Sequence, residues 1–460
     1  MQINYYSHAA FKILSSDNVS ILTDPWISNP IYGNSICLFP QLKINKEDYV
    51  NQDYLYISHD HPDHLCINTL KLFKKSIKIL IRKYDDTSVV KDKLTNLGFV
   101  NIYEMEDRET KKLTDKFEVT LYCDHTSTDS LMIFKDDEHC FLDQNDCLLD
   151  EKTYEEIGNK FKIDLGAVFY SGGSMYPGCF DYDHNQKKEL TKKRIFEQFD
   201  YSISCMKLMK IKNIIPGAND MCLIRNADFD DYSSALPIEF MNYLKEKNLD
   251  IKVLLMSSGD TYDFGKTDYK YVNFIKSRKE WKEKVNNYRN TKSVKLLNKK
   301  LDCWEKNNIF DRQNFESVFN DFLSKTNIEK NKSVEIKNFK VYLEIISSKD
   351  RSLNYEITID DDKNSLKPTS NSFNEQDFHM KITTEDFLVE MCMNGRYQWE
   401  DLLNNRWRVV RKNNGYSEAE YYFWIYLTKF SDYLLATNQL NYLNERDSLK
   451  LKCWDINVTS

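Results

Sequence analysis

Three of the chain's eight histidines lie within six residues, in the stretch HDHPDH at positions 59–64. This stretch follows an apolar run, YLYIS (54–58), which we predict to be a β-strand, so its side chains would spread from one loop at a sheet edge. Neutral imidazoles bind zinc or iron, and a carboxylate beside them adds negative charge that helps to hold a second divalent ion. Pro62 stiffens the turn. A polar turn whose histidines only form hydrogen bonds is the alternative, but this spacing favours a metal site.

The composition places this loop in a protein of more than one domain. At 460 residues the chain is too long for one ordinary core, and no apolar run approaches the roughly 20 residues that a membrane-spanning helix needs. The start MQINYYSHAAFKIL lacks the regions of an export signal, and eleven cysteines without a CxxC pair indicate reduced thiols. We therefore expect a cytoplasmic protein. The net charge of −7 argues against a generally basic nucleic-acid binder.

Short β-like runs alternate with polar connections from Met1 to about Phe264, and most functional-looking residues lie at the downstream ends of these runs. The clearest runs are VSILTD (19–24), YLYIS (54–58), KILIR (78–82), FEVTLYC (117–123), SLMIF (130–134), CFLD (140–143) and LGAVFYSGG (165–173). We therefore predict a metal-binding catalytic domain over residues 1–265.

The pattern changes after Phe264. Residues 266–300 carry twelve Lys or Arg against three Asp or Glu, with apolar residues at roughly helical spacing. We predict a helical connector over 266–335 and a smaller α+β domain over 336–460.

Three features support the α+β prediction for the C-terminal part. FKVYLEII (339–346) and LNYEITI (353–359) indicate the strands of a hairpin, and residues 361–376 indicate a polar loop. TTEDFLVEMCMNG (383–395) then has a Thr N-cap, early acidic residues and a terminal Gly, which together predict a helix.

The HDHPDH stretch matches the HxHxDH signature of the metallo-β-lactamase superfamily at every defining position, and the chain resembles that family. The resemblance implies an α/β fold, a four-layer αββα sandwich with the metal site between the edges of its two sheets. It also implies that His59 and His61 bind a first metal ion, and that Asp63 and His64 bind a second.

The family resemblance implies three further ligands downstream. His125, which follows the FEVTLYC run, stands where the third ligand of the first metal belongs. The acidic turn in EHCFLDQNDC (138–147) corresponds to the family's bridging aspartate, for which we choose Asp146, with Asp143 as the alternative. The last expected ligand, a histidine, falls in NIIPGAND (213–220), where Ala218 occupies its place. The second metal is therefore short of one ligand and is expected to bind more weakly.

Further motifs narrow the resemblance to the metallo-β-lactamase-type portion of CMP-N-acetylneuraminate hydroxylase and its bacterial relatives. These are SHAAFKI…ILTDPWI (7–27), TDSLMIF…FLDQNDC (128–147), DLGAVFYSGGSMYPGCF (164–180) and KNIIPGAND (212–220), with NGRYQWEDLLNNRWRVVRKNNGYSEAEYYF (394–423) in the tail. The strand, hairpin and helix order of the tail also resembles a sterol-carrier-protein-like module. The paired Cys-x-His and Cys-x-x-His motifs of the hydroxylase's Rieske cluster are missing from this sequence.

Two residues near the first strands have open roles. His8 is either beside the metals, where the resemblance places its counterpart, or a core histidine. Asp24 ends a strand in TDPW, where it either accepts a hydrogen bond from a metal-bound histidine or forms a turn before proline. The basic run KKELTKKR (187–194) would attract an anionic substrate, although such runs are more typical of a solvated helix face.

The intact HxHxDH motif favours a metal-dependent enzyme. Two divalent ions would lower the pKa of a bound water to roughly 7 and provide hydroxide at neutral pH. The ions would be zinc or, in an oxygenase, iron. We expect this hydroxide to attack a carbonyl or phosphoryl centre of a small anionic molecule, with Asp63 or Asp146 in the catalytic role of positioning it. The breadth of the superfamily favours hydrolysis.

Two other hypotheses stay open. A di-iron oxygenase that receives electrons from a separate protein is the first, because the same His and Asp side chains can hold two irons. A non-catalytic binding protein with a decayed site is the second, with Ala218 as its only positive sign. We expect no membrane partner. Nucleic acid is not an expected partner either: the basic 266–300 stretch could bind it, but the net charge is acidic and the final histidine that the family expects is missing.

Overall fold

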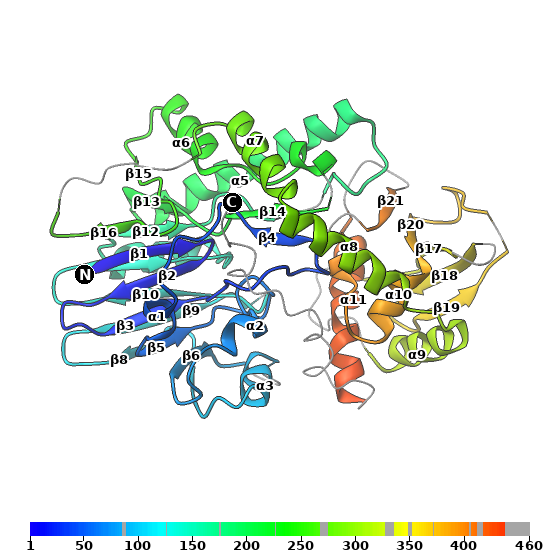
Figure 1. Cartoon of the computed structure of the whole chain (residues 1–460), viewed down its shortest axis with the longest axis horizontal. Coiled ribbons are helices and arrows are strands. Elements are labelled where there is room, and N and C mark those ends of the chain that lie inside the picture. Colours follow the sequence, from blue (N-terminus) through cyan, green and yellow to red (C-terminus); the bar gives the residue numbers. More distant parts are fainter. Residues whose placement is uncertain are drawn as a thin grey trace.

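Two seven-stranded mixed sheets form the centre of the N-terminal part of the chain (Figure 1). The computed structural model describes residues 1–84, 89–125, 127–173, 176–225, 227–266, 275–326, 335–347, 352–370, 372–403, 406–411 and 417–437. None of the helices in these ranges is both long and apolar enough to cross a lipid bilayer.

The first sheet carries the histidine loop at the end of a central strand. Its strands, in spatial order, are β16 (Thr261–Asp263), β1 (Gln2–Ser7), β2 (Ala10–Leu14), β3 (Ser20–Thr23), β5 (Tyr54–Tyr56), β6 (Lys78–Arg82) and β7 (Asn101–Met105). Strands β3, β5, β6 and β7 run parallel to one another, so the loops that follow them leave from the same edge.

The second sheet packs against the first through an apolar core that both sheets fill. Its strands, in spatial order, are β15 (Lys252–Val253), β13 (Asn213–Pro216), β12 (Leu165–Val168), β11 (Cys140–Asp143), β10 (Ser130–Lys135), β9 (Glu118–Cys123) and β8 (Thr110–Lys112). Phe11 and Tyr56 from one sheet meet Phe141 and Phe134 from the other. A small two-stranded sheet pairs β4 (Ile36–Leu38) with β14 (Met221–Leu223).

Helices cover the outer face of each sheet and complete a four-layer αββα sandwich, which confirms the predicted fold class (Figure 1). On the first sheet these are α1 (Lys46–Val50), α2 (Ile67–Leu70) and α3 (Val89–Asn96). On the second they are α4 (Glu151–Lys160), α5 (His184–Leu208) and α6 (Pro237–Glu246), with the 3-10 helix η1 (Ala227–Asp231) beside them. All seven strands predicted from the apolar runs are present.

The predicted connector consists of three helices that pack on different cores. Helices α7 (Arg278–Arg289) and α8 (Lys292–Lys306) bury Trp281 and Leu301 in the core of the second sheet. Helix α9 (Arg312–Lys325) buries Phe319 in the C-terminal core instead. Residues 267–274 and 327–334 of this connector lie outside the described residues, and the predicted domain boundaries stay a prediction.

The C-terminal part contains a separate five-stranded sheet with helices against it, consistent with the predicted α+β class. The spatial order is β19 (Ser365–Pro368), β18 (Leu353–Ile359), β17 (Phe339–Ile346), β20 (Met380–Glu385) and β21 (Arg408–Arg411). Its helices are α9, α10 (Asp386–Met393), η2 (Glu400–Leu403) and α11 (Glu418–Ala436). The end of the predicted domain, residues 438–460, lies outside the described residues.

Two local predictions for this part are wrong. The predicted polar loop 361–376 contains β19, because Leu366 points into the core and its amide is held by the Asn320 side chain. The helix N-cap is Glu385 rather than a threonine, since both threonines of the TTED stretch belong to β20. The predicted terminal glycine, Gly395, does end the helix in the left-handed conformation that suits glycine.

Candidate metal centre

The histidine loop leaves β5 at the edge where the parallel strands of the first sheet end. Its second half forms a single helical turn, in which the amides of His64 and Leu65 donate to the carbonyl oxygen of His61 at 3.0 and 2.7 Å. Because a helical turn places neighbouring side chains on different sides, the loop directs its ligand-type side chains into two separate groups.

The first group contains His59, His61 and Asp146, whose nearest ligand atoms all lie within 4.8 Å of one another. His59 Nε2 lies 2.7 Å from His61 Nδ1. His59 is buried, His61 is exposed, and the Asp146 side chain is 30% exposed. This group is therefore open to solvent on the side of His61.

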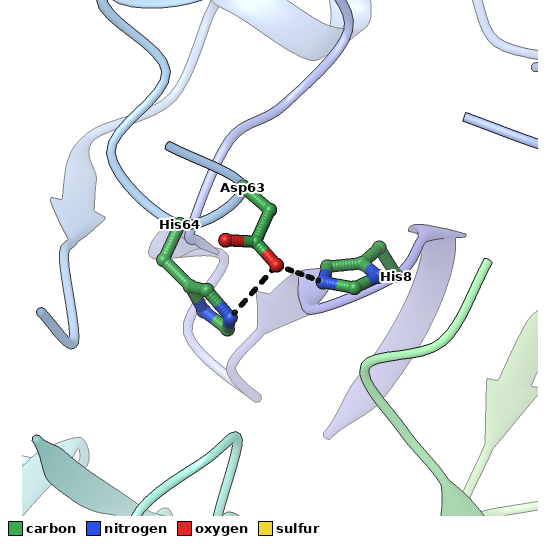
Figure 2. Close-up of side chains that lie close together, drawn as sticks. All are labelled: His8, Asp63 and His64. Carbon is green, nitrogen blue, oxygen red and sulfur yellow. Dashed lines mark hydrogen bonds and ion pairs between the residues drawn. The ribbon is translucent and has the colours of Figure 1, made fainter. Parts of the chain in front are cut away.

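The second group contains His8, Asp63 and His64, and all three are buried. Asp63 Oδ2 lies 3.1 Å from His8 Nε2 and 3.7 Å from His64 Nε2, so one carboxylate oxygen faces both imidazoles (Figure 2). His8 reaches the group from the turn between β1 and β2, where its φ of 51° places it in the left-handed region.

Asp146 lies between the two groups, since its Oδ2 is also 3.4 Å from His64 Nε2. The preceding residue, Asn145, has a φ of 43° and donates from its side chain to the carbonyl oxygen of Ser130, which fixes the turn that carries Asp146. The alternative bridging residue, Asp143, is buried behind the site and belongs to neither group. Burial and the neighbouring Asp24 raise the pKa of Asp143 to about 8.

Asp24 supports the second group from behind. Its Oδ2 lies 2.7 Å from His64 Nδ1, and its two oxygens accept from the amide and hydroxyl of Ser58 at 2.8 and 2.6 Å. Because His64 Nδ1 is held in this way, its Nε2 is directed toward Asp63 and Asp146. Ser58 Oγ also lies 2.9 Å from Nδ1 of His59, which leaves the Nε2 atom of that residue for the first group.

The residues of the second group fit a bound cation. His64 Nε2 is buried and has no hydrogen-bond partner within the described ranges, although two carboxylates lie near it. Burial lowers the pKa of His64, but Asp63, Asp24 and Asp146 outweigh burial and place that pKa well above its ordinary value. Buried imidazoles surrounded by several carboxylates form a donor set that a divalent metal ion would neutralise and complete.

The structure does not bring His125 to either group. Its side chain is 69% exposed and its Nε2 lies 3.1 Å from Asp107 Oδ2. The backbone amide of Asp124 donates to the carbonyl oxygen of Asp129, and this turn directs His125 away from the histidine loop. Its role as the third ligand of the first metal stays a prediction.

Two residues near the groups were not found from the sequence. Asp129 Oδ1 lies 3.8 Å from His59 Nδ1, and burial raises the pKa of Asp129 to about 6. The position of Asp129, directly before the SLMIF strand, was the sequence signal that could have identified it. The hydroxyl of Tyr32 donates to Asp63 Oδ1 at 2.6 Å, but a tyrosine in a distant turn gave no signal in the sequence.

Ala218, which stands in place of the expected last histidine, lies beside His8. Its amide donates to the carbonyl oxygen of His8 at 3.0 Å. This hydrogen bond joins the end of β13 to the turn that carries His8.

Comparisons with known proteins agree with the sandwich fold. Residues 2–142 match the family model described as the beta-lactamase superfamily domain. A protein of Mycobacterium tuberculosis that is named as a Rieske 2Fe-2S iron-sulfur protein is 26% identical over 282 residues, 57% of this chain and 54% of that protein. The chain thus spans about half the length of the first curated relatives it matches.

Two other relatives are named for two different reactions, hydroxylation and hydrolysis. Cytidine monophosphate-N-acetylneuraminic acid hydroxylase of Asterias rubens is 24% identical over 226 residues, 47% of this chain and 33% of that protein. A UPF0173 metal-dependent hydrolase of Pyrobaculum islandicum is 36% identical over 93 residues, 20% of this chain and 37% of that protein.

Proposed function

Because residues 2–142 are a metallo-β-lactamase superfamily domain, we propose that the chain is a metal-dependent hydrolase that acts on a small anionic substrate. One observation carries this proposal. Each of the two groups supplies two histidines and one carboxylate, and Asp146 lies between them. Three protein ligands with further positions open are typical of catalytic rather than structural metal sites.

The exposure of the ligands determines from which side a substrate would enter. Divalent ions bound in the two groups would polarise a carbonyl or phosphoryl oxygen of the substrate. They would also lower the pKa of a metal-bound water molecule to about 7. The exposed His61 and the partly exposed Asp146 open the first group to solvent, whereas the second group is buried. We assign to Asp146 the orientation of the attacking water, because its carboxylate is the one that both groups share and that solvent reaches.

A cavity next to the histidine loop supports a small, anionic substrate. It has a volume of about 100 Å³ and lies between this loop and the C-terminal part of the chain. Among the side chains that line it, three carry positive and two carry negative charge: Lys71, Lys93, Arg396, Asp60 and Asp401. Lys93 and Asp60 form an ion pair at 3.3 Å, and the small positive excess of the lining would attract an anionic group.

A second candidate function is oxidation by two irons. Two histidines and one carboxylate are also the ligand set of non-haem iron oxygenases, and each group supplies that set. The names of the relatives from Mycobacterium tuberculosis and Asterias rubens favour this candidate. Because the sequence lacks the Rieske motif pair, electrons would come from a separate protein.

Elemental analysis and the visible spectrum of protein purified from its own host, without chelators, would test the proposal. A hydrolase is expected to contain zinc, to lack visible absorption and to cleave phosphate or carboxylate esters without oxygen. If the protein contains iron and consumes oxygen, the result would contradict hydrolysis and support oxidation by two irons. Protein that contains no metal and does not take up zinc or iron would contradict both.

A further inference from the structure

The turn at residues 29–35 has an unusual backbone. Tyr32, Gly33 and Asn34 have φ angles of 48°, 58° and 58°, so three successive residues lie in the left-handed region, and two of them are not glycine. The turn is closed by the amide of Ile31, which donates to the carbonyl oxygen of Ile36 at 2.9 Å. Because this conformation is unfavourable for residues with a Cβ atom, it persists only where surrounding contacts hold it.

One side of the turn contacts the second ligand group. The Tyr32 hydroxyl donates to Asp63 Oδ1 at 2.6 Å, while Asp63 Oδ2 faces His8 and His64. The tyrosine therefore occupies one carboxylate oxygen and leaves the other for the ligand group. Without this hydrogen bond, the carboxylate of Asp63 would be held only through Oδ2, by His8 and His64.

The other side of the turn contacts the C-terminal part of the chain. Asn34 Nδ2 donates to the hydroxyl of Tyr397 at 3.1 Å. Gly33 lies against Asp401 so closely that a Cβ atom at this position would be 3.0 Å from the Asp401 Cβ atom. Both contacts come from the segment between α10 and β21, so the C-terminal part fixes the turn that carries Tyr32.

Tyr397 is in turn fixed by a buried charge cluster. Its hydroxyl donates to Glu305 near the end of α8, the helix that runs diagonally between the two parts of the molecule (Figure 1). Glu305 also binds Arg225 from the N-terminal part and Arg406 from the C-terminal part, with N to O distances of 2.8 Å. Since Glu305 is only 1% exposed, the cluster provides a rigid support for the tyrosine.

We propose that Tyr32 is a positioning residue for the metal ligand Asp63, and that the C-terminal part of the chain keeps it in place through Asn34 and Tyr397. This inference rests on the proposed metal site. It gives the C-terminal part a role in metal binding although none of its described residues belongs to either ligand group.

Metal titration of the full-length chain tests the first half of the proposal. Zinc is added to metal-free protein in competition with a chelating dye, and the step that belongs to the second group is identified as the one that His8→Ala weakens. Tyr32→Phe should weaken the same step at least tenfold and leave the other step unchanged, because residues that orient a ligand typically contribute ten- to a hundredfold in affinity.

Tyr6→Phe is the matched control. It removes a similar hydrogen bond, 2.5 Å from the Tyr6 hydroxyl to Asp48, at a place outside both ligand groups, and should leave both steps unchanged. Unchanged zinc binding in Tyr32→Phe, or an equal loss in both steps, would overturn the proposal.

A second pair of variants tests the connection to the C-terminal part. Tyr397→Phe keeps the buried ring but loses the hydrogen bonds with Asn34 and Glu305, and it should weaken the same zinc step by a smaller factor. The double variant with Tyr32→Phe should bind zinc no more weakly than Tyr32→Phe alone, because both changes act through one contact. Fully additive losses would show that Tyr397 acts independently and would refute this part of the proposal.

Hydrogen exchange of the metal-free chain separates this inference from the proposed function. Tyr32→Phe and Tyr397→Phe should both speed the exchange of the His64 and Leu65 amides, which donate to His61 in the wild-type turn. Tyr6→Phe should not. If the wild-type chain bound no metal, the proposed function would fail, whereas unchanged exchange in both variants would contradict the positioning role itself.

Discussion

Replacement of Glu305 by glutamine should strongly destabilise the contact between the two parts of the chain. The side chain keeps its size but loses its charge, and Arg225 and Arg406 then lie against a neutral amide in a buried place. Removal of one partner from a buried ion pair costs about 3–5 kcal/mol. Because Asp302 lies 3.5 Å from Arg225 and both arginines are slightly exposed, we expect a loss near the lower limit, about 3 kcal/mol.

Urea unfolding followed by tryptophan fluorescence measures this loss as a change in the free energy of unfolding at constant slope. Glu197→Gln provides the control, since it breaks an exposed pair in which Lys193 and Glu197 lie 3.8 Å apart. That variant should lose no more than about 0.5 kcal/mol. A loss below about 1 kcal/mol in Glu305→Gln would refute the reasoning, because the buried cluster would then contribute no more than an exposed pair.

Three further predictions concern the metal centre. His59→Ala and His61→Ala should each abolish metal binding in the first group, as measured by elemental analysis, but leave the circular dichroism spectrum unchanged. Full metal content in either variant would show that the replaced residue is not a ligand. His8→Ala should weaken metal binding in the second group, so that a chelator releases that ion at a lower concentration, whereas Ala218→His should change little because His8 already supplies a ligand atom to this group. Equal affinities in all three proteins would contradict this. Asp24→Asn should lower the affinity of the second group about ten- to a hundredfold, since a neutral amide holds His64 Nδ1 less strongly than a carboxylate does. A titration indistinguishable from that of the wild type would count against it.

The sandwich could be predicted because its signals are local. Each apolar run that follows a polar connection became a strand, and the HDHPDH stretch lies at the end of one of them, where loops from parallel strands meet. The family resemblance pointed to this acidic turn, and Asp146 was chosen over Asp143 because it follows the turn residue Asn145. Asp146 lies in the first group whereas Asp143 is buried at the end of β11, and the role of Asp146 as a ligand stays a prediction. Apart from that resemblance, these arguments need only the periodicity of a strand and the position of a turn.

The contacts that could not be predicted depend on long-range geometry. His125 follows a strand in the expected place, but a hydrogen bond between Asp124 and Asp129 turns it outward, and no sequence pattern specifies that turn. Tyr32 reaches Asp63 from a turn whose conformation is held by contacts with the C-terminal part of the chain. Leu366 is an isolated apolar residue in a polar stretch, and only the position of the neighbouring strand shows that it is buried.

The packing of α7 and α8 on the second sheet has a consequence for synthesis of the chain on the ribosome. Trp281 and Leu301 fill the same core as the strands that precede residue 265, so that core lacks part of its apolar surface until Leu301 has been made. At 5–20 residues per second, translation from residue 265 to Leu301 takes about 2–7 s. During this interval the nascent sandwich exposes the face of the second sheet that these helices later cover. We therefore expect chaperones that bind apolar surface to hold the nascent chain at this stage, and a gene ended at residue 265 to yield an aggregating product.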